Sequence, residues 1–435
     1  MKPTTPSTRR RSPWTWIPTL YFAQGLPYVA VMTISVIMYK RLGLSNTDIA
    51  LYTGWLGLPW VIKPFWSPFV DIVRTKRWWT LTMQAVIALA LAGIAFSLPT
   101  PFYVQFTLAV FLLMGLASAT HDIAADGFYL LALNEHDQSF YVGIRSTFYR
   151  IAMVVGQGPL VILAGLLETT TGDIPLAWSV VFVVLSAFFL LVVVYHHWTL
   201  PRPPVDTERR HTDVRGIVQG FADAFRTFFT KRRPLETTAA LAFMLLYRFP
   251  EAQLTKIIQP FLLDPTDRGG LGLSTAQVGL TYGTVGVIGL TLGGIIGGMA
   301  AARGGLRRWL TPMAWSMSLT CLTFVYLSYA PAPSLLTVNL CVFVEQFGYG
   351  FGFTAYMLFL IHFSDGPYKT SHYAICTGFM ALSMMLGMMA GWLQEQIGYR
   401  HFFIWTVLCC VTTIGTALLV KSASGLGQKG SGETN

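Results

Sequence analysis

The chain has 435 residues, of which 53% are hydrophobic and only 11% are charged, and its formal net charge is +10. A soluble globular domain carries about 25% charged residues, so this composition predicts an integral membrane protein and excludes an ordinary soluble one. The basic residues lie in short stretches between apolar segments, which indicates orientation in a bilayer and not a surface that binds nucleic acid.

Apolar segments long enough to cross a membrane recur along the whole chain. A spanning helix needs about 20 mostly apolar residues. The first segment is longer than the core of a signal peptide and has no small-residue cleavage site behind it, so we expect it to be retained. We predict twelve transmembrane helices, at residues 14–38, 48–70, 78–98, 102–130, 140–167, 175–199, 236–262, 275–301, 308–330, 334–363, 372–396 and 399–420.

The longest polar stretch divides these helices into two groups of six. Hydrophobic residues within it recur at helical spacing from Ile217 to Phe229, which predicts an amphipathic helix on the cytoplasmic face; a disordered basic linker is the alternative. Lys and Arg gather on the side of the two termini and the linker, so we expect both termini to be cytoplasmic. The expected organisation is a basic N-terminus at 1–13, a six-helix bundle at 14–199, the linker at 200–235, a second bundle at 236–420 and a tail at 421–435.

The loop between the second and third segments carries a short charged motif. Asp71 is followed by Arg74, Lys76 and Arg77. This resembles the loop signature of the major facilitator superfamily, an aspartate followed by a basic cluster. Six plus six helices with a long cytoplasmic connection also resemble that architecture. The resemblance implies an all-α fold of two six-helix halves, with a structural or gating role for Asp71, Arg74 and Arg77.

Six charged residues fall about mid-way along predicted membrane helices. A charge at that depth is expensive and normally faces a partner or a water-filled path. The pattern therefore indicates a polar cavity inside a helical bundle, as a transporter requires. The six residues are Lys63, Asp122, Arg150, Arg248, Glu251 and Glu345.

Two ion pairs are expected between segments 102–130 and 140–167, which run antiparallel across a short loop. Asp126 and Arg145 lie at similar distances from the turn, and so do Asp122 and Arg150. We therefore predict the pairs Asp126–Arg145 and Asp122–Arg150, the first with a structural or gating role. The alternative is that both pairs are static clamps between the helices.

The carboxylates of the second half suggest proton handling. Arg248 and Glu251 are three residues apart and can pair within one helix. Glu345 has no cation at a corresponding depth in its own hairpin. A carboxyl group removed from water is more easily protonated, so Glu345 and Asp122 are the leading proton carriers and Glu251 is a third candidate. A neutral carboxyl group that is merely hydrogen-bonded in the core is the alternative.

The basic residues suggest the charge of the substrate. Lys63, Arg150 and Arg248 would form a positive wall, which favours an anionic or zwitterionic solute. Aromatic side chains in the same helices, such as Tyr149, suit sugars or peptides. Nothing in the chain matches a P-loop, a serine-hydrolase elbow or a zinc motif, so we expect no enzyme activity, no metal and no cofactor, and energy from an ion gradient.

Motifs in several helices carry a closer resemblance, to the AmpG-type muropeptide permeases of the major facilitator superfamily. Some positions depart from the family pattern: His121 stands for Gln, Gln346 for Asn, and Arg248 and Glu251 for Lys and Asp. The matching stretches are Tyr21–Pro27, Lys63–Asp71, His121–Gly127, Tyr149–Met153, Leu246–Glu251 and Glu345–Gly352.

The resemblance implies proton-driven import of N-acetylglucosaminyl-anhydro-N-acetylmuramyl peptides across the bacterial inner membrane, by alternating access between the two halves. It adds Gln24, Tyr149 and Gln346 to the candidate substrate-binding residues. The expected partners are the muropeptide, protons and the lipid bilayer, with no nucleic acid, and we expect a monomer. The departures leave open another anionic solute, such as a siderophore or a coenzyme A conjugate; a membrane sensor or receptor is the alternative outside transport.

Overall fold

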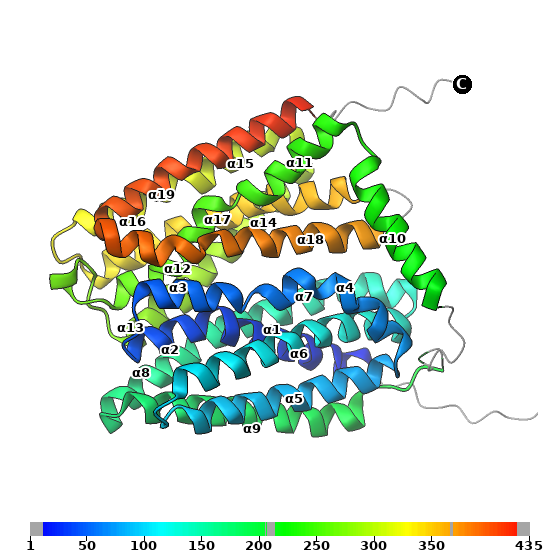
Figure 1. Ribbon diagram of the computed structural model, residues 1–435, viewed down its shortest axis with the longest axis horizontal. Coiled ribbons are helices and arrows are strands. Elements are labelled where there is room, and N and C mark those ends of the chain that lie inside the picture. The colour runs from blue at the N-terminus through cyan, green and yellow to red at the C-terminus, as the bar shows by residue number, and fades with distance from the viewer. Residues whose placement is uncertain (1–11, 205, 207–213, 366–368, 424–435) are drawn as a thin grey trace, which may run out of the picture.

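The computed structural model describes residues 12–423 except 205, 207–213 and 366–368, and this part of the chain is helical throughout apart from its loops. Helices from the two ends of the sequence form two layers (Figure 1). The lower layer contains η1 (Pro13–Thr15), α1 (Ile17–Val29), η2 (Ala30–Ile34), α2 (Ser35–Arg41), α3 (Asn46–Trp55), α4 (Leu58–Ile72), α5 (Lys76–Ser97), α6 (Tyr103–Ala132), α7 (Glu135–Gln157), α8 (Pro159–Thr171) and α9 (Ile174–Thr199).

The upper layer is built from the second part of the chain, and α10 (Val214–Thr230) crosses from one layer to the other at the end where the C-terminus lies (Figure 1). The helices of this second part are α11 (Pro234–Leu246), α12 (Phe249–Leu263), η3 (Thr266–Arg268), α13 (Thr275–Val278), η4 (Gly279–Gly286), α14 (Val287–Gly304), α15 (Leu306–Leu319), α16 (Leu322–Tyr329), α17 (Leu335–Phe363), α18 (Lys369–Met385), η5 (Leu386–Met389) and α19 (Ala390–Ala423), and the short α13 reaches down to α8.

Eight helical stretches of the described chain are long and apolar enough to cross a membrane. The last, Ser371–Ala423, has 53 residues and bends at Gly398, where φ is 74°, so it is long enough for two passes. The predicted segments 48–70, 236–262 and 334–363 fall outside the eight; they correspond to α3–α4, α11–α12 and α17. Twelve transmembrane helices therefore stay a prediction.

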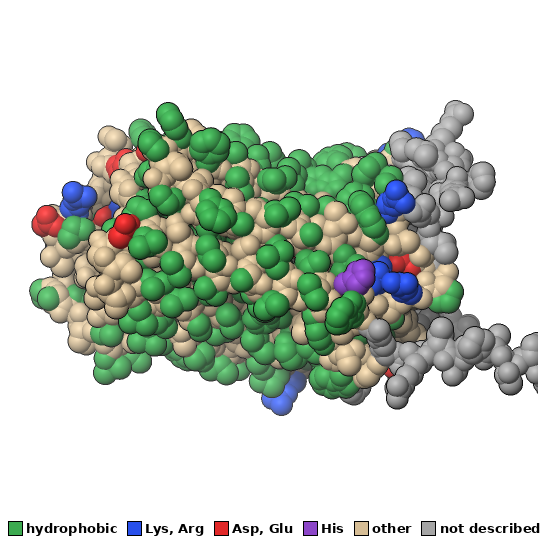
Figure 2. All heavy atoms as spheres, turned by 90° about the horizontal axis from the view of Figure 1, so that it is seen from below, with side chains coloured by type: hydrophobic (Ala, Val, Ile, Leu, Met, Phe, Trp, Pro, Cys, Tyr) green, Lys and Arg blue, Asp and Glu red, His purple; other side chains and the backbone are tan. Residues whose placement is uncertain are grey.

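The outer surface has the pattern of a membrane protein. Figure 2 shows hydrophobic side chains over the broad middle of one face, with charged side chains gathered at its two ends. Large apolar side chains such as Phe96 and Leu191 are 76% and 69% exposed. A soluble protein rarely exposes so continuous an apolar surface, and a bilayer would cover it.

Several helices are interrupted where the sequence breaks their hydrogen bonding. Between α11 and α12, Pro250 lies in the first turn of α12 and disfavours helical continuation before it, which leaves Arg248 as the N-cap residue of α12. Pro27 precedes the π-helical turn η2, and the glycine-rich η4 is also π-helical. Such interruptions reorient side chains within a helix and are frequent at functional sites.

Glycines allow the two layers to pack backbone to backbone, as two positions illustrate. A Cβ atom added at Gly391 of α19 would lie 1.8 Å from the carbonyl oxygen of Asn46 in α3. One added at Gly283 of η4 would lie 1.8 Å from the carbonyl oxygen of Gln157 in α7. No larger residue fits either position without separating the layers, which is the usual reason for glycine at contacts between membrane helices.

A helix forms within the predicted linker. In α10, Phe228 is fully buried, and its ring centroid lies 5.3 Å from that of Phe363 and 6.0 Å from that of Phe379. The side chains of Ile217 and Phe221 lie outside the described residues. The helix is therefore attached to the end of α17 and to α18 in the upper layer.

Candidate functional site

Asp122 of α6 forms an ion pair with Lys63 of α4, with 3.6 Å between Oδ2 and Nζ. The Lys63 side chain is 28% exposed and that of Asp122 only 14%. Gln24 of α1 and Trp60 of α4 also face this carboxylate. The Oε1 atom of Gln24 is buried and has no hydrogen-bond partner among the described residues, so the Gln24 side chain has an unused acceptor.

The predicted Asp122–Arg150 pair is wrong. Asp122 pairs with Lys63, while Arg150 of α7 is exposed and forms no ion pair within the described part of the chain. The prediction assumed that consecutive helices lie side by side. In the structure α7 packs along α1, as the contact of Tyr149 with Gly25 shows.

Arg150 lies on the face of α7 that is turned toward the upper layer. It is four residues before Val154 and seven before Gln157, so the three share one helix face. The carbonyl oxygen of Gln157 meets Gly283 of the upper layer. Arg150 is exposed about two turns before the point where α7 meets the upper layer, and it forms no ion pair among the described residues.

The predicted Asp126–Arg145 pair is confirmed. Arg145 Nη2 lies 3.1 Å from Asp126 Oδ1, and the hydroxyl of Tyr21 donates to the same oxygen at 3.1 Å. The Arg145 guanidinium group also lies over the rings of Tyr21 and Tyr129, 4.6 and 5.0 Å from their centroids. These contacts join α1, α6 and α7, and the two rings hold the cation in one orientation.

The predicted Arg248–Glu251 pair is also present, and it is bidentate. Arg248 Nε donates to Glu251 Oε2 at 3.0 Å and Nη2 to Oε1 at 3.2 Å, while Nη2 also donates to the Tyr349 hydroxyl at 2.8 Å. The rings of Phe353 and Tyr356 cover the guanidinium group, with centroids 4.8 and 5.8 Å away. Arg248 is only 7% exposed, so this cation is fully occupied in the present conformation.

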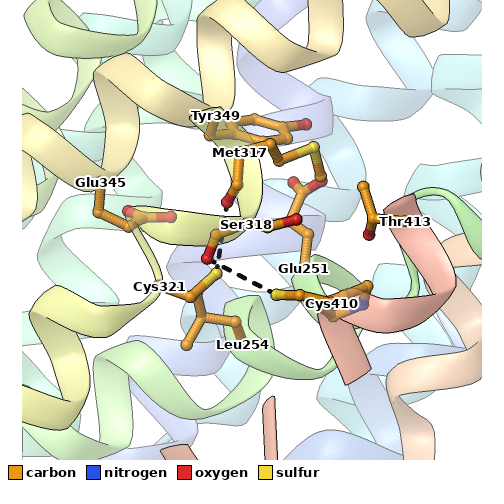
Figure 3. A pocket seen from close by; sticks show the side chains of 10 residues that line it. Glu251, Leu254, Met317, Ser318, Cys321, Glu345, Tyr349, Cys410 and Thr413 are labelled. Atoms are coloured by element: carbon orange, nitrogen blue, oxygen red, sulfur yellow. Dashed lines mark hydrogen bonds between the residues drawn. The ribbon is translucent and has the colours of Figure 1, made fainter. Parts of the chain in front are cut away.

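Glu345 and Glu251 line one small cavity in the upper layer. Their side chains point into it from α17 and α12, together with Tyr349 (Figure 3). Its volume is about 10 Å³, close to what a single water molecule needs. Glu345 is 3% exposed and forms no ion pair among the described residues; its Oε2 accepts from Gln346 Nε2 at 2.8 Å. Gln346, a predicted substrate-binding residue, is thus held by its neighbour here.

Tyr28 of α1 lies between the Lys63–Asp122 pair and the Arg248–Glu251 pair. It interacts electrostatically with Asp122 of the lower layer and with Arg248 and Glu251 of the upper layer. The structure therefore brings most of the predicted charged residues around one region between the layers. The sequence did not single out Tyr28 as a candidate, nor Lys256, which lies two turns further along α12 than Arg248.

A second buried polar network joins the helices of the lower layer. Gln84 of α5 donates through Nε2 to His121 Nε2 at 3.0 Å and accepts through Oε1 from His196 Nδ1 at 3.1 Å. The other ring nitrogen of His196 lies 2.9 Å from the Thr19 hydroxyl. His121 therefore belongs to a network that ties α1, α5, α6 and α9 together.

Polar contacts connect the layers at the end away from α10. Lys40 Nζ lies 2.8 Å from Asp264 Oδ1, and Asp264 also accepts from the hydroxyl of Tyr399. Asn46 donates to Gln394 at 2.5 Å and to Tyr399 at 2.9 Å. We call Lys40, Asn46, Asp264, Gln394 and Tyr399 the end latch. It joins the two layers at this end of the molecule.

The predicted gating loop contacts the start of the linker. The backbone N–H groups of Lys76 and Arg77, at the N-terminus of α5, donate to the carboxylate of Asp206 at 2.7 and 3.0 Å, where a helix end favours an anion. Arg77 Nε also donates to the Leu200 carbonyl at 3.4 Å, and Arg74 lies over the Trp78 ring. The side chain of Asp71 lies outside the described residues.

Comparison with known proteins places these features in context. The sequence matches the Major Facilitator Superfamily over residues 19–388. A putative transporter AmpG 4 of Rickettsia conorii is 25% identical over 91% of this chain and 93% of the relative. The anhydromuropeptide permease of Escherichia coli K12 is 24% identical over 90% of this chain and 76% of the relative.

Solved structures share the fold. A D-xylose-proton symporter superposes with a TM-score of 0.72 at 14% identity, covering 95% of this chain and 98% of that one. A bacterial homologue of the human lysosomal transporter Spinster, in an inward-facing and unoccupied conformation, superposes with a TM-score of 0.71 at 15% identity, covering 96% and 98%.

Proposed function

Because the chain belongs to the major facilitator superfamily and is thus a multi-pass membrane transporter and not an enzyme, we propose that it imports anhydromuropeptides in symport with protons. The membrane would be the bacterial inner membrane, with both termini in the cytoplasm. The names of the relatives and the motifs around Gln24, Asp122 and Arg150 support this substrate over other anionic solutes.

The observation that carries proton coupling is the arrangement of Glu345. This carboxyl group is buried, has no cation partner among the described residues and shares a cavity with Glu251. A carboxyl group in such a place changes its protonation with its surroundings, as proton relays in transporters do. One water in the cavity would suffice to pass a proton between the two carboxyl groups.

The ion pairs suggest how protons and an anionic substrate are coupled. Lys63 and Arg248 are each neutralised by a carboxylate of the protein, Asp122 and Glu251. Protonation of either carboxylate would release its cation, which could then bind a carboxylate of the substrate. Proton and substrate would therefore enter the site together.

The end latch supports an alternating-access cycle. With the termini in the cytoplasm, the latched end is periplasmic, and the conformation described here is closed to the periplasm. Rocking of the two layers about the charged region would open the latch and close the opposite end. Arg150, which is exposed on α7, would meet substrate when the cytoplasmic end is open.

The test is uptake of radiolabelled anhydro-disaccharide tripeptide into cells, with and without a protonophore. We expect accumulation that collapses when the protonophore is added. The variant Glu345→Gln should lose accumulation but retain exchange of labelled for unlabelled substrate, because exchange needs no net proton transfer. Asp223→Asn, an exposed carboxylate on α10, is the matched control. Absence of uptake by inserted wild-type protein would refute the substrate, and full accumulation by Glu345→Gln would refute its role.

A further inference from the structure

Lys256 is a buried cation that reaches from one layer to the other. It lies on α12 and is 4% exposed, and its Nζ donates to the hydroxyl of Thr53 on α3 at 3.0 Å. Thr53 in turn donates to the carbonyl oxygen of Ile49. The ammonium group therefore bridges the two layers through a neutral hydroxyl.

Lys256 lacks the ion-pair partner that Lys63 and Arg248 have. Lys63 pairs with Asp122 and Arg248 with Glu251, whereas Lys256 forms no ion pair with any described carboxylate. An ammonium group can donate three hydrogen bonds, and a single hydroxyl acceptor does not neutralise its charge. A buried charge is normally paired because its desolvation is costly. The described part of the protein thus provides no anion that neutralises the Lys256 ammonium group.

A cavity of about 30 Å³ lies beside Lys256, between the layers. Tyr28 and Trp60 line it from the lower layer and Met384 from the upper layer, so apart from the ammonium group its walls are aromatic and apolar. The hydroxyl of Tyr28 makes no hydrogen bond among the described residues and can act as a second donor.

A second polar group on the same helix is also unsatisfied. Gln259 lies three residues after Lys256, on the same side of α12, and is 3% exposed. Its Oε1 is buried without any hydrogen-bond partner in the described chain. One helix face thus carries a cation whose charge no protein anion neutralises and an acceptor without a donor among the described residues.

We propose that Lys256 binds a single carboxylate of the transported solute in this cavity, with Tyr28 as a further donor. The inference rests on the proposed function for the identity of the solute. One ammonium group matches the one charge of a carboxylate, while a phosphate dianion would bring a second charge that no cation lining the cavity neutralises. The bound carboxylate would hold the layers together, because Lys256 belongs to one layer and Tyr28 to the other.

The test uses matched small probes on the purified full-length protein. Thermal unfolding is followed with N-acetylalanine, with N-acetylalaninamide, which has the same size but no charge, and with inorganic phosphate. A ligand that binds only the folded protein raises its unfolding temperature. The variants are Lys256→Gln, Lys256→Arg, which retains the charge, and Lys421→Gln as a control at the far end of α19. Size-exclusion chromatography confirms that each variant is folded.

We expect N-acetylalanine to raise the unfolding temperature of wild type and of Lys421→Gln, and N-acetylalaninamide to have little effect on either. In Lys256→Gln the carboxylate should bind about tenfold more weakly, as expected for the loss of one charge-assisted hydrogen bond, so the two probes should then act alike. Lys256→Arg should retain part of the difference between the probes. Equal responses of wild type and Lys256→Gln, or no response of wild type to the carboxylate, would overturn the proposal, and so would Lys256-dependent binding of phosphate in preference to carboxylate.

Uptake of the anhydro-disaccharide tripeptide, measured separately, distinguishes the two proposals. If wild type binds the carboxylate probe through Lys256 but transports no muropeptide, the carboxylate site stands and the proposed substrate falls. Suppose that wild type transports the muropeptide and takes it up in preference to the same muropeptide with its C-terminal carboxylate converted to an amide. If Lys256→Gln shows the same preference, the carboxylate site is refuted.

Discussion

Substitution of Asp264 by Asn should open the latched end. Asp264 accepts hydrogen bonds from Lys40, at 2.8 Å, and from Tyr399, and both side chains of the ion pair are about nine-tenths buried, at 13% and 10% exposure. The amide has nearly the same shape but no charge. Loss of a charged partner from a buried pair costs roughly 3–5 kcal/mol, and because Asn retains some hydrogen bonding we expect about 2–3 kcal/mol.

That free energy is lost only while the latch is closed, so it appears in the equilibrium between closed and open forms. About 2–3 kcal/mol raises the ratio of open to closed protein by roughly 30- to 150-fold. A suitable reporter is Ala50→Cys, in protein whose five native cysteines are replaced. Ala50 is fully buried on α3. Its neighbours along the helix, Asn46 and Gly54, contact Gly391 and Met388 of the upper layer.

The assay is the rate of labelling of this cysteine by a membrane-impermeant maleimide added from the outside. The rate should rise with the open population in Asp264→Asn. Asp267→Asn, an exposed carboxylate in the same loop, should leave it unchanged. An unchanged rate in Asp264→Asn would show that the end latch does not hold this end closed.

Three further changes test other contacts. Gly391→Ala places a methyl group 1.8 Å from the Asn46 carbonyl oxygen. We therefore expect faster labelling of the Ala50→Cys reporter and loss of uptake. Gly415→Ala, in open space on the same helix, should change neither readout. Tyr21→Phe removes the hydrogen bond to Asp126 and should lower the unfolding free energy by about 1 kcal/mol; no drop in unfolding temperature would contradict a bracing role. Phe228→Ala empties a fully buried ring position and should detach α10, at a cost of about 3–5 kcal/mol, visible as faster amide exchange in α10 but not in α5.

The ion pairs separate what the sequence can specify from what it cannot. Arg248 and Glu251 pair because a spacing of three places them on one face of a single helix, which is a local property. The Asp126–Arg145 pair follows from depth along two helices. Asp122 and Arg150 match equally well in depth, yet Asp122 pairs with Lys63 and Arg150 is exposed without an ion pair among the described residues. Depth is readable from hydropathy; the rotation of each helix depends on its neighbours, and α7 packs against α1.

Lys256 shows the same limit. Its charge is visible in the sequence, and its position along α12 places it well inside the molecule. The acceptor that it meets, Thr53, lies 203 residues earlier in the chain and in the other layer. No local pattern connects these two residues. The positions of most apolar helices along the chain are predictable because hydrophobic length is a local signal. Contacts between the layers arise only when the whole chain is folded.

The hydrogen-bonded chain around Gln84 has a consequence for proton leakage. His121 is the neighbour of Asp122 in sequence, and His196 lies beyond Gln84. Two imidazole rings in direct contact could pass a proton onward, but a side-chain amide at neutral pH does not readily give up one proton while taking another. Gln84 separates the two rings, so under the proposed proton symport a proton near Asp122 would not pass through them to Thr19 and α9. The proposed coupling would then depend on this separation as well as on the candidate proton-carrying carboxylates.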